Sequence, residues 1–273
     1  MKRPNERPLL LALDLDGTLV QSLHPIRPAV VAAVRRALAA GVRATIATGR
    51  TFIGTAPYVR ELGITGPVVC YQGAAVVDSA SGRFESEVPL ANAVALRIYY
   101  AAKEAGYHVQ FYADDRFYVD ELNRFVDRYA KISGSDPVVV ASLPEAFAGR
   151  DSTKVNIITT LDRVEACESL MRSVCGEDAY VTRSNPEFVE MLDPRVDKGR
   201  ALQVVARSAG IPMERVLAIG DSYNDLPLLR AAGFAVAMGS APPELRAEAD
   251  AVVGDVEHDG VAEAIERFVL SET

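Results

Sequence analysis

The chain has 273 residues, of which 49% are hydrophobic and 24% charged, values typical of globular proteins. This apolar content excludes an intrinsically disordered chain, because enough surface can be buried to offset the entropy of ordering. The 29 basic and 37 acidic residues leave a formal net charge of −8, which repels phosphate backbones and argues against nucleic-acid binding.

The N-terminal part of the chain alternates short apolar runs with amphipathic segments. We expect strands at residues 9–13, 42–47 and 67–71. A first helix is expected to begin at Pro28 and to end before Gly41, and a second helix to end before Gly63. This alternation is typical of a parallel sheet wound with helices.

The pattern changes after residue 74 and returns after Lys198. Residues 74–88 predict a hairpin, and the tyrosine-rich or β-branched runs that follow predict further strands between helices. Beyond Lys198 we expect helices at 199–209, 223–232 and 261–269 and strands at 216–219 and 235–237. We therefore predict an α/β fold in which a Rossmann-like core, residues 1–84 and 191–273, carries an inserted α/β domain at residues 85–190.

The sequence predicts a cytoplasmic protein that does not associate with membranes. Its three cysteines, Cys70, Cys167 and Cys175, lack CxxC spacing and indicate neither a disulfide framework nor a zinc site. The apolar run at 9–13 is shorter than the core of a secretory signal, and no apolar stretch approaches the length of a membrane span.

Acidic residues follow two of the predicted core strands. Asp14-Leu15-Asp16-Gly17-Thr18 comes directly after the first strand, and Gly220-Asp221-Ser222-Tyr223-Asn224-Asp225 comes after the strand at 216–219. An isolated Asp-Gly is usually only a turn signal, but a second Asp ends the same buried strand. Because parallel strands end at one edge of a sheet, Asp14 and Asp221 can face one ion.

Two further segments supply groups that suit a phosphate. Thr48-Gly49-Arg50 follows the second strand, where a hydroxyl and backbone N–H groups before a helix can hold an anion. Lys198 directly precedes the helix expected at 199–209 and would add a cation. Taken with the carboxylates, which suit Mg²⁺, these groups predict phosphoryl transfer. The chain contains no nucleotide P-loop, GxSxG or HExxH motif.

These four segments occur in the order of the four motifs of the haloacid dehalogenase superfamily, and the chain resembles its Cof-type phosphatases, which carry an α/β cap between the second and third motifs. The resemblance covers essentially the whole chain. It implies that residues 85–190 are such a cap, and that a small phosphorylated metabolite, such as a sugar phosphate, is hydrolysed with Mg²⁺ through an aspartyl-phosphate. It names no individual substrate.

The resemblance also implies residue roles. Asp14 matches the nucleophile and a metal ligand, and Asp16 matches the general acid/base, whose backbone carbonyl also binds the metal. Asp221 matches the remaining metal ligand, with Asp225 directly behind it. The positions that hold the phosphate are Leu15 (through its backbone), Thr48, Gly49, Lys198 and Asn224. Gln72 stands where relatives show Asn, so it is left out of the predicted site, and Arg50 is given no role.

Two alternatives share these motifs. A phosphomutase or phosphotransferase on the same scaffold would replace water with an alcohol, and would release no inorganic phosphate from a sugar phosphate without a second sugar. A non-catalytic binding module would be expected to lack one of the carboxylates or the lysine, and all of them are present here.

Overall fold

The computed structural model describes residues 4–21 and 24–271 and divides into two compact units. The first unit comprises Met1–Gly49, Thr55–Glu85 and Asp197–Thr273, and the second comprises Arg50–Gly54 and Ser86–Val196. Each unit has its own sheets and its own buried apolar residues, so each is described separately.

The first unit is built on a parallel sheet with the strand order β14-β13-β12-β1-β2. Its central strands are short apolar runs that are buried on both faces, as is usual where helices cover both sides of a parallel sheet. The bounds are β1 Leu10–Leu13, β2 Arg43–Ile46, β12 Val216–Gly220, β13 Phe234–Ala237 and β14 Ala251–Val252.

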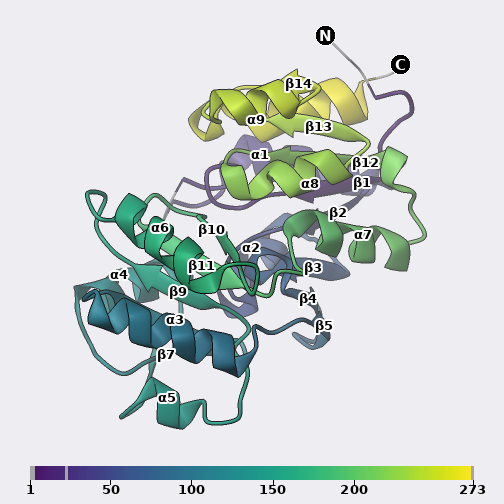
Figure 1. Cartoon of the computed structure of the whole chain (residues 1–273). Coiled ribbons are helices and arrows are strands. Elements are labelled where there is room, and N and C mark those ends of the chain that lie inside the picture. Colours follow the sequence, from purple (N-terminus) through teal and green to yellow (C-terminus); the bar gives the residue numbers. More distant parts are fainter. Residues whose placement is uncertain (1–3, 22–23, 272–273) are drawn as a thin grey trace. The chain divides into compact units, whose positions relative to one another are not determined.

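Strand β1 lies between β2 and β12, so the strand order reverses at β1. Connections of one hand then place α1, between β1 and β2, and α8, between β12 and β13, on opposite faces of the sheet. Figure 1 shows α8 and α9 (green to yellow) along β12 and β13. The helices that lie wholly in this unit are α1 Pro28–Ala39, α7 Lys198–Ser208, α8 Leu226–Ala231, α9 Pro243–Glu248 and α10 Gly260–Ile265.

A smaller antiparallel sheet, β3-β4-β5, continues from β2. Its first strand runs parallel to the chain that leaves β2, because Ala47 and Val69 form a bridge and the Thr48 N–H donates to the Val69 carbonyl at 2.9 Å. The strands are β3 Pro67–Cys70, β4 Ala75–Asp78 and β5 Phe84–Glu87. The end of β3 therefore lies beside the segment that follows β2.

The second unit has one sheet with the order β10-β11-β9-β6-β7-β8. Helices α3 and α6 pack against each other and supply the buried core on one face of this sheet (Figure 1). The strands are β6 His108–Ala113, β7 Arg116–Val119, β8 Val138–Val139, β9 Val155–Ile158, β10 Tyr180–Thr182 and β11 Phe188–Leu192, and the helices are α3 Asn92–Glu104, α4 Arg124–Ser133, α5 Leu143–Ala146 and α6 Val164–Cys175.

The observed division differs from the predicted boundaries in two places. The predicted boundary between residues 190 and 191 falls inside β11, which pairs with β9 and β10, and the unit ends instead at Val196. Residues 50–54 group with the second unit, although the predicted core included them. Helix α2, Phe52–Leu62, therefore has its first turn in one unit and the remainder in the other.

The structure also bears on the predictions about membranes and cysteines. Among the residues that the structure describes, no helix combines the length and the apolar character that a membrane span needs. Cys70, Cys167 and Cys175 are free and buried.

Candidate active site

Three of the predicted segments meet at the carboxyl edge of the parallel sheet. Leu13 at the end of β1 is in register with Ile219 on one side and Ile46 on the other. The next residue, Asp14, donates its backbone N–H to the Ile219 carbonyl at 3.0 Å. The strands thus bring the segments after residues 13, 46 and 219 side by side, although they are far apart in the sequence.

Lys198, the first residue of α7, connects the two acidic segments. Its Nζ lies 2.6 Å from Asp14 Oδ1 and 2.7 Å from Asp225 Oδ1, and its side chain is fully buried. Burial on its own would lower the pKa of Lys198, but the two carboxylates raise it above its usual range, so the ammonium group stays charged. Lys198 is therefore a buried cation held between two acids rather than a solvated surface lysine.

Asp221 is held by the turn that follows Asp14. The Thr18 hydroxyl donates to Asp221 Oδ1 at 3.0 Å. Gly17 lies against the same carboxylate with φ +90°, and a Cβ added there would be 2.3 Å from Asp221 Oδ2. Only glycine satisfies both the backbone angle and this close approach.

Asp225 organises the loop after β12. Its Oδ2 accepts the backbone N–H groups of Asp221 at 3.0 Å and Ser222 at 3.2 Å, while Oδ1 accepts from Lys198. Both oxygens are thus engaged within the protein. The structure places Asp225 directly behind Asp221, where it supports the loop and the lysine.

The three carboxylates form a site that suits a hard divalent cation. Oxygen atoms of Asp14, Asp221 and Asp225 lie within 4.8 Å of one another. Within the described residues, Asp14 Oδ2 is buried and has no hydrogen-bond partner. Carboxylate oxygens at this spacing are the ligands that Mg²⁺ prefers, so the residues present fit this ion.

The charges in this cluster also favour binding of a divalent cation. Burial and the charge of Asp225 raise the pKa of Asp14 well above its usual range, against the opposing effect of Lys198. The same two causes, burial and Asp225, raise the pKa of Asp221 to about 7. Three acids facing one ammonium group leave negative charge uncompensated, and a divalent cation would remove that repulsion.

The predicted phosphate-binding residues Thr48, Gly49 and Asn224 are linked by Gln72. The Gln72 N–H donates to the Thr48 carbonyl at 2.9 Å, and Asn224 Nδ2 donates to Gln72 Oε1 at 3.1 Å. A Cβ added to Gly49 would lie 2.4 Å from Gln72 Nε2. These contacts place Gln72 within the candidate site.

Gln72, which the sequence analysis leaves out of the predicted site, therefore contacts two of its residues. Tyr71 and Gln72 are buried and have left-handed φ angles of 52° and 57°. Two consecutive non-glycine residues in this conformation are unusual and tend to occur at functional sites. The signal in the sequence is the position of Gln72 directly after β3, since the other candidate residues also follow strand ends.

The turn after β1 is closed by its own backbone. The Leu15 carbonyl accepts the N–H groups of Leu19 and Val20, both at 2.9 Å, and the Leu15 side chain is buried. Asp16 lies half-buried in this turn, two residues from Asp14. The turn thus keeps Leu15 and Asp16 beside the carboxylate cluster.

The start of α2, which follows the Thr48-Gly49-Arg50 segment, is capped by an aspartate. The first two N–H groups of α2, from Phe52 and Ile53, donate to the two carboxylate oxygens of Asp115, each at 2.7 Å. The Thr48 N–H is used in the bridge to Val69. A carboxylate of the second unit's β6–β7 turn thus occupies the first two N–H groups of the helix, so the predicted anion site concerns the residues before the helix, Thr48, Gly49 and Arg50.

The comparisons with known proteins fit this geometry. The profile of the haloacid dehalogenase-like hydrolases matches residues 11–265. The chain belongs to this family. It is 29% identical to the pyridoxal phosphate phosphatase YbhA of Escherichia coli, covering 94% of this chain and 97% of that protein. It is 30% identical to a phosphoglycolate phosphatase of Methanothermobacter thermautotrophicus, covering 95% and 98%.

A solved haloacid dehalogenase-like hydrolase from Bacteroides thetaiotaomicron superposes with a TM-score of 0.85 at 29% identity, covering 96% of this chain and 99% of that one. The predicted family, the α/β fold class and the assignment as a phosphomonoester hydrolase are thereby confirmed.

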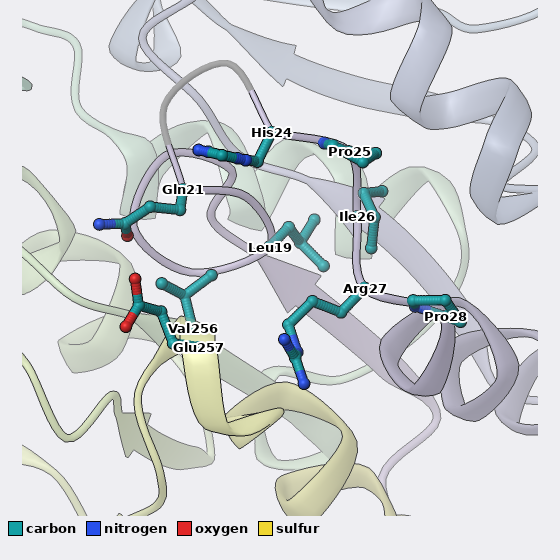
Figure 2. A pocket seen from close by; sticks show the side chains of 9 residues that line it. All are labelled: Leu19, Gln21, His24, Pro25, Ile26, Arg27, Pro28, Val256 and Glu257. Carbon is teal, nitrogen blue, oxygen red and sulfur yellow. The ribbon is translucent and has the colours of Figure 1, made fainter.

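The hydrolase also has a cavity of about 470 Å³ in its first unit. Figure 2 shows Leu19, Ile26 and Val256 lining this cavity, with Arg27 at its side. The Arg27 guanidinium pairs with Asp259, with 2.5 Å between Nε and Oδ1. None of the lining residues belongs to the carboxylate cluster, so this cavity is not the candidate active site.

Proposed function

We propose that this hydrolase cleaves a small phosphomonoester, such as a sugar phosphate, through a covalent aspartyl-phosphate. The observation that carries the proposal is the state of Asp14. One of its oxygens is fixed by Lys198, and the other is buried without a partner among the described residues, at the carboxyl edge of the central strand. A fixed carboxylate with one unengaged oxygen beside a buried cation suits nucleophilic attack on a phosphoryl group.

The proposed reaction uses two aspartates in two steps. A carboxylate oxygen of Asp14 attacks phosphorus, the bond from phosphorus to the alcohol oxygen breaks, and Asp16 gives its proton to that oxygen. Asp16, now a carboxylate, then takes a proton from water as the water oxygen attacks phosphorus. The bond from phosphorus to Asp14 breaks, and inorganic phosphate leaves with Asp14 and Asp16 returned to their first states.

Asp14 and Asp221 would hold Mg²⁺ through their carboxylates, and the family resemblance adds the backbone carbonyl of Asp16. When bound, the ion supplies positive charge that offsets the carboxylates and the phosphoryl oxygens. Asp225 keeps the Asp221 loop in place, since its Oδ2 holds the backbone N–H groups of that loop.

The phosphate oxygens would be bound by Thr48, Gly49, Asn224 and Lys198, together with the backbone of Leu15. Gln72 supports this role, because it contacts both Thr48 and Asn224. We assign it to orienting the Asn224 amide. The names of two relatives, a pyridoxal phosphate phosphatase and a phosphoglycolate phosphatase, support a small phosphorylated metabolite as the substrate.

The experiment is a phosphate-release screen over sugar phosphates and cofactor phosphates. We expect release with Mg²⁺, loss of release with excess EDTA, and recovery when Mg²⁺ is added back. Ca²⁺ should support turnover poorly, because its looser coordination would misalign in-line attack. Release from a sugar phosphate with no second sugar present separates hydrolysis from a mutase reaction. Full activity in EDTA, or no release from any compound, would overturn the proposal.

We further propose that the second unit acts as a cap that selects the substrate, while the first unit carries the phosphoryl chemistry. The residues proposed for the chemistry all belong to the first unit, and the second unit has a separate core. A domain without chemistry of its own is free to vary for recognition.

A further inference from the structure

The turn that follows β3 lies between two segments of the candidate site, and all three belong to the first unit. We call it the β3 turn, Tyr71–Gly73. On one side, the Gln72 N–H donates to the Thr48 carbonyl at 2.9 Å. On the other side, Gly73 has a φ of +101°, and a Cβ added there would lie 2.2 Å from the backbone oxygen of Asp197, the residue before α7. The β3 turn is therefore packed tightly between the Thr48 segment and the start of α7.

The backbone of the β3 turn is strained, and its glutamine is buried. Tyr71 and Gln72 both have left-handed φ angles, and Gln72 is 1% exposed. Strained backbone persists only where the surrounding contacts hold it, and a buried amide is costly unless it is hydrogen-bonded. We therefore expect the Gln72 side chain to have a role that requires this conformation.

The Gln72 side chain holds one end of the Asn224 amide, and Ser222 holds the other. Asn224 Nδ2 donates to Gln72 Oε1 at 3.1 Å, and the Ser222 hydroxyl donates to Asn224 Oδ1 at 2.7 Å. Asn224 is 5% exposed, and its side chain makes these two hydrogen bonds within the part of the chain that the structure describes. The amide is thus buried and fixed from both sides, by residues of two different loops.

The direction of these bonds decides which group of Asn224 remains available. Ser222 Oγ already accepts the backbone N–H of Asp225 in a capping box, so its hydrogen is the group that it offers to Asn224. Turning the Asn224 amide around would place its Oδ1 against Gln72 Oε1, and two acceptors would then face each other. With both bonds made, the oxygen of Asn224 is used and one of the two Nδ2 hydrogens is left.

A remaining N–H group suits a phosphate oxygen, whereas a remaining carbonyl oxygen would repel it. This difference matters at a site where carboxylate oxygens of Asp14, Asp221 and Asp225 already lie within 4.8 Å of one another. A further acceptor facing the phosphate would add to the repulsion that it meets there. The orientation of the Asn224 amide therefore decides whether this residue favours or opposes phosphate binding.

We propose that Ser222 and Gln72 are positioning residues that together keep an N–H group of Asn224 available to the phosphate, and that the strained β3 turn holds Gln72 in the place this requires. The inference rests on the proposed function and extends it to Ser222 and the β3 turn, to which the sequence analysis gives no role. Ser222 and Gln72 do not bind the phosphate themselves, since they act through Asn224.

A residue that acts only through Asn224 has no effect once that amide is removed. The effects of Gln72→Met and of Ser222→Ala should therefore disappear when either is combined with Asn224→Ala, and the double-mutant cycle should show a coupling as large as the single effect. Residues that only stabilise the loop would instead give losses that multiply with the loss in N224A. The cycle thus separates positioning from a general structural role.

The test uses the full chain with Mg²⁺ and the ester that is turned over best in the phosphate-release screen. We measure kcat, KM and the Ki of inorganic phosphate for Q72M, S222A, N224A and the two double variants. Each single variant should raise KM and Ki by the same factor, about tenfold, since it loses one hydrogen bond to a charged group. The value of kcat should change by less than about threefold, because the phosphate is bound alike in the ground state and the transition state. The double variants should differ from N224A by less than about twofold.

Two further variants serve as controls. Ser222→Thr keeps the hydroxyl and should have the wild-type Ki. Gln203→Met makes the same chemical change as Q72M at an exposed glutamine of α7 and should leave Ki unchanged. A wild-type Ki in Q72M or S222A, or losses in the double variants that multiply, would overturn the inference. If Q72M does not fold, S222A and S222T decide it in the same way.

A measurement of thermal stability does not depend on turnover. Inorganic phosphate with Mg²⁺ should raise the Tm of the wild-type protein, because a ligand stabilises the state that binds it. This shift should be smaller in Q72M, S222A and N224A, and no smaller in the double variants than in N224A. If the wild type releases phosphate from no ester, the proposed function fails and the Tm series decides this inference separately. No shift in the wild type, or equal shifts in all the variants, would then overturn it.

Discussion

Asp115 accepts a hydrogen bond of 2.7 Å from the backbone N–H of Phe52, the first residue of α2, and a second of the same length from Ile53. Asp114 and Asp115 have φ angles of 52° and 56°, as in a two-residue turn of the hairpin type between β6 and β7. The hairpin thus presents a carboxylate to the positive end of the helix that follows Thr48 and Gly49.

We predict that Asp115→Ala weakens the first turn of α2 and disturbs the Thr48–Gly49 segment that precedes it. Loss of this cap should cost about 1 kcal/mol of stability and raise KM for all substrates alike, whatever their leaving group. Amide hydrogen exchange should become faster at Phe52 and Ile53. Asp114→Ala is the control, since the exposed Asp114 pairs with Arg150 on the surface, at 2.5 Å, and does not cap the helix. Unchanged exchange at both amides would contradict the prediction.

Asp14→Asn should abolish turnover. The amide keeps the shape of the side chain but is a far weaker nucleophile and metal ligand, so kcat should fall by at least ~10³, about 4 kcal/mol of barrier. Circular dichroism should show that the fold is retained. Asp136→Asn, at an exposed aspartate outside the site, should keep wild-type activity. A D14N protein with a tenth of wild-type turnover would refute the role of Asp14.

Lys198→Met should be both inactive and strongly destabilised. It leaves the carboxylates of Asp14 and Asp225 buried without their cation, and removing one partner of a buried ion pair costs about 3–5 kcal/mol. The double variant K198M/D225N removes one of these charges and should regain much of the stability, but not the turnover. Thermal unfolding in EDTA and phosphate release measure the two effects. If K198M keeps the wild-type Tm, the ion pairs of Lys198 with Asp14 and Asp225 contribute little to stability and the prediction is wrong.

The stability of the second unit should fall in mild acid because of His108. Burial, and then the charge of Lys103, lower the pKa of His108 from 6.5 to about 4, against the opposing charges of Glu121 and Asp120. Between these two pH values His108 therefore binds a proton in the unfolded chain but not in the folded chain. The free energy of unfolding is at its full value above pH 6.5 and decreases as the pH falls towards 4.

Between pH 7 and pH 5 this group should account for a loss of about 2 kcal/mol. His108→Gln should show a correspondingly smaller loss over the same interval, because glutamine does not titrate. Urea unfolding at pH 7 and at pH 5 gives the change in unfolding free energy for each protein. Other titrating groups contribute equally to both proteins, so the difference between the two changes reports on His108. Identical pH dependence in the two proteins would show that His108 is not protonated on unfolding in this range.

The sequence by itself determined the parts of this hydrolase that depend on local patterns. Short apolar runs become buried strands, and their period differs from that of amphipathic helices such as α1 and α7. The polar segments that begin at Asp14, Thr48 and Asp221 were identifiable because each directly follows such a run. The weakest local signals were missed, since β14 spans only Ala251–Val252 and α9 only Pro243–Glu248.

Tertiary structure decided which of these side chains meet. Lys198 and Asp14 are 184 positions apart in the sequence, and no local propensity indicates that their side chains lie 2.6 Å apart. The same holds for Gln72 beside Asn224 and for Asp115 at the start of α2. These relationships arise because strand order and register bring distant segments together, and burial then fixes whether each polar atom finds a partner.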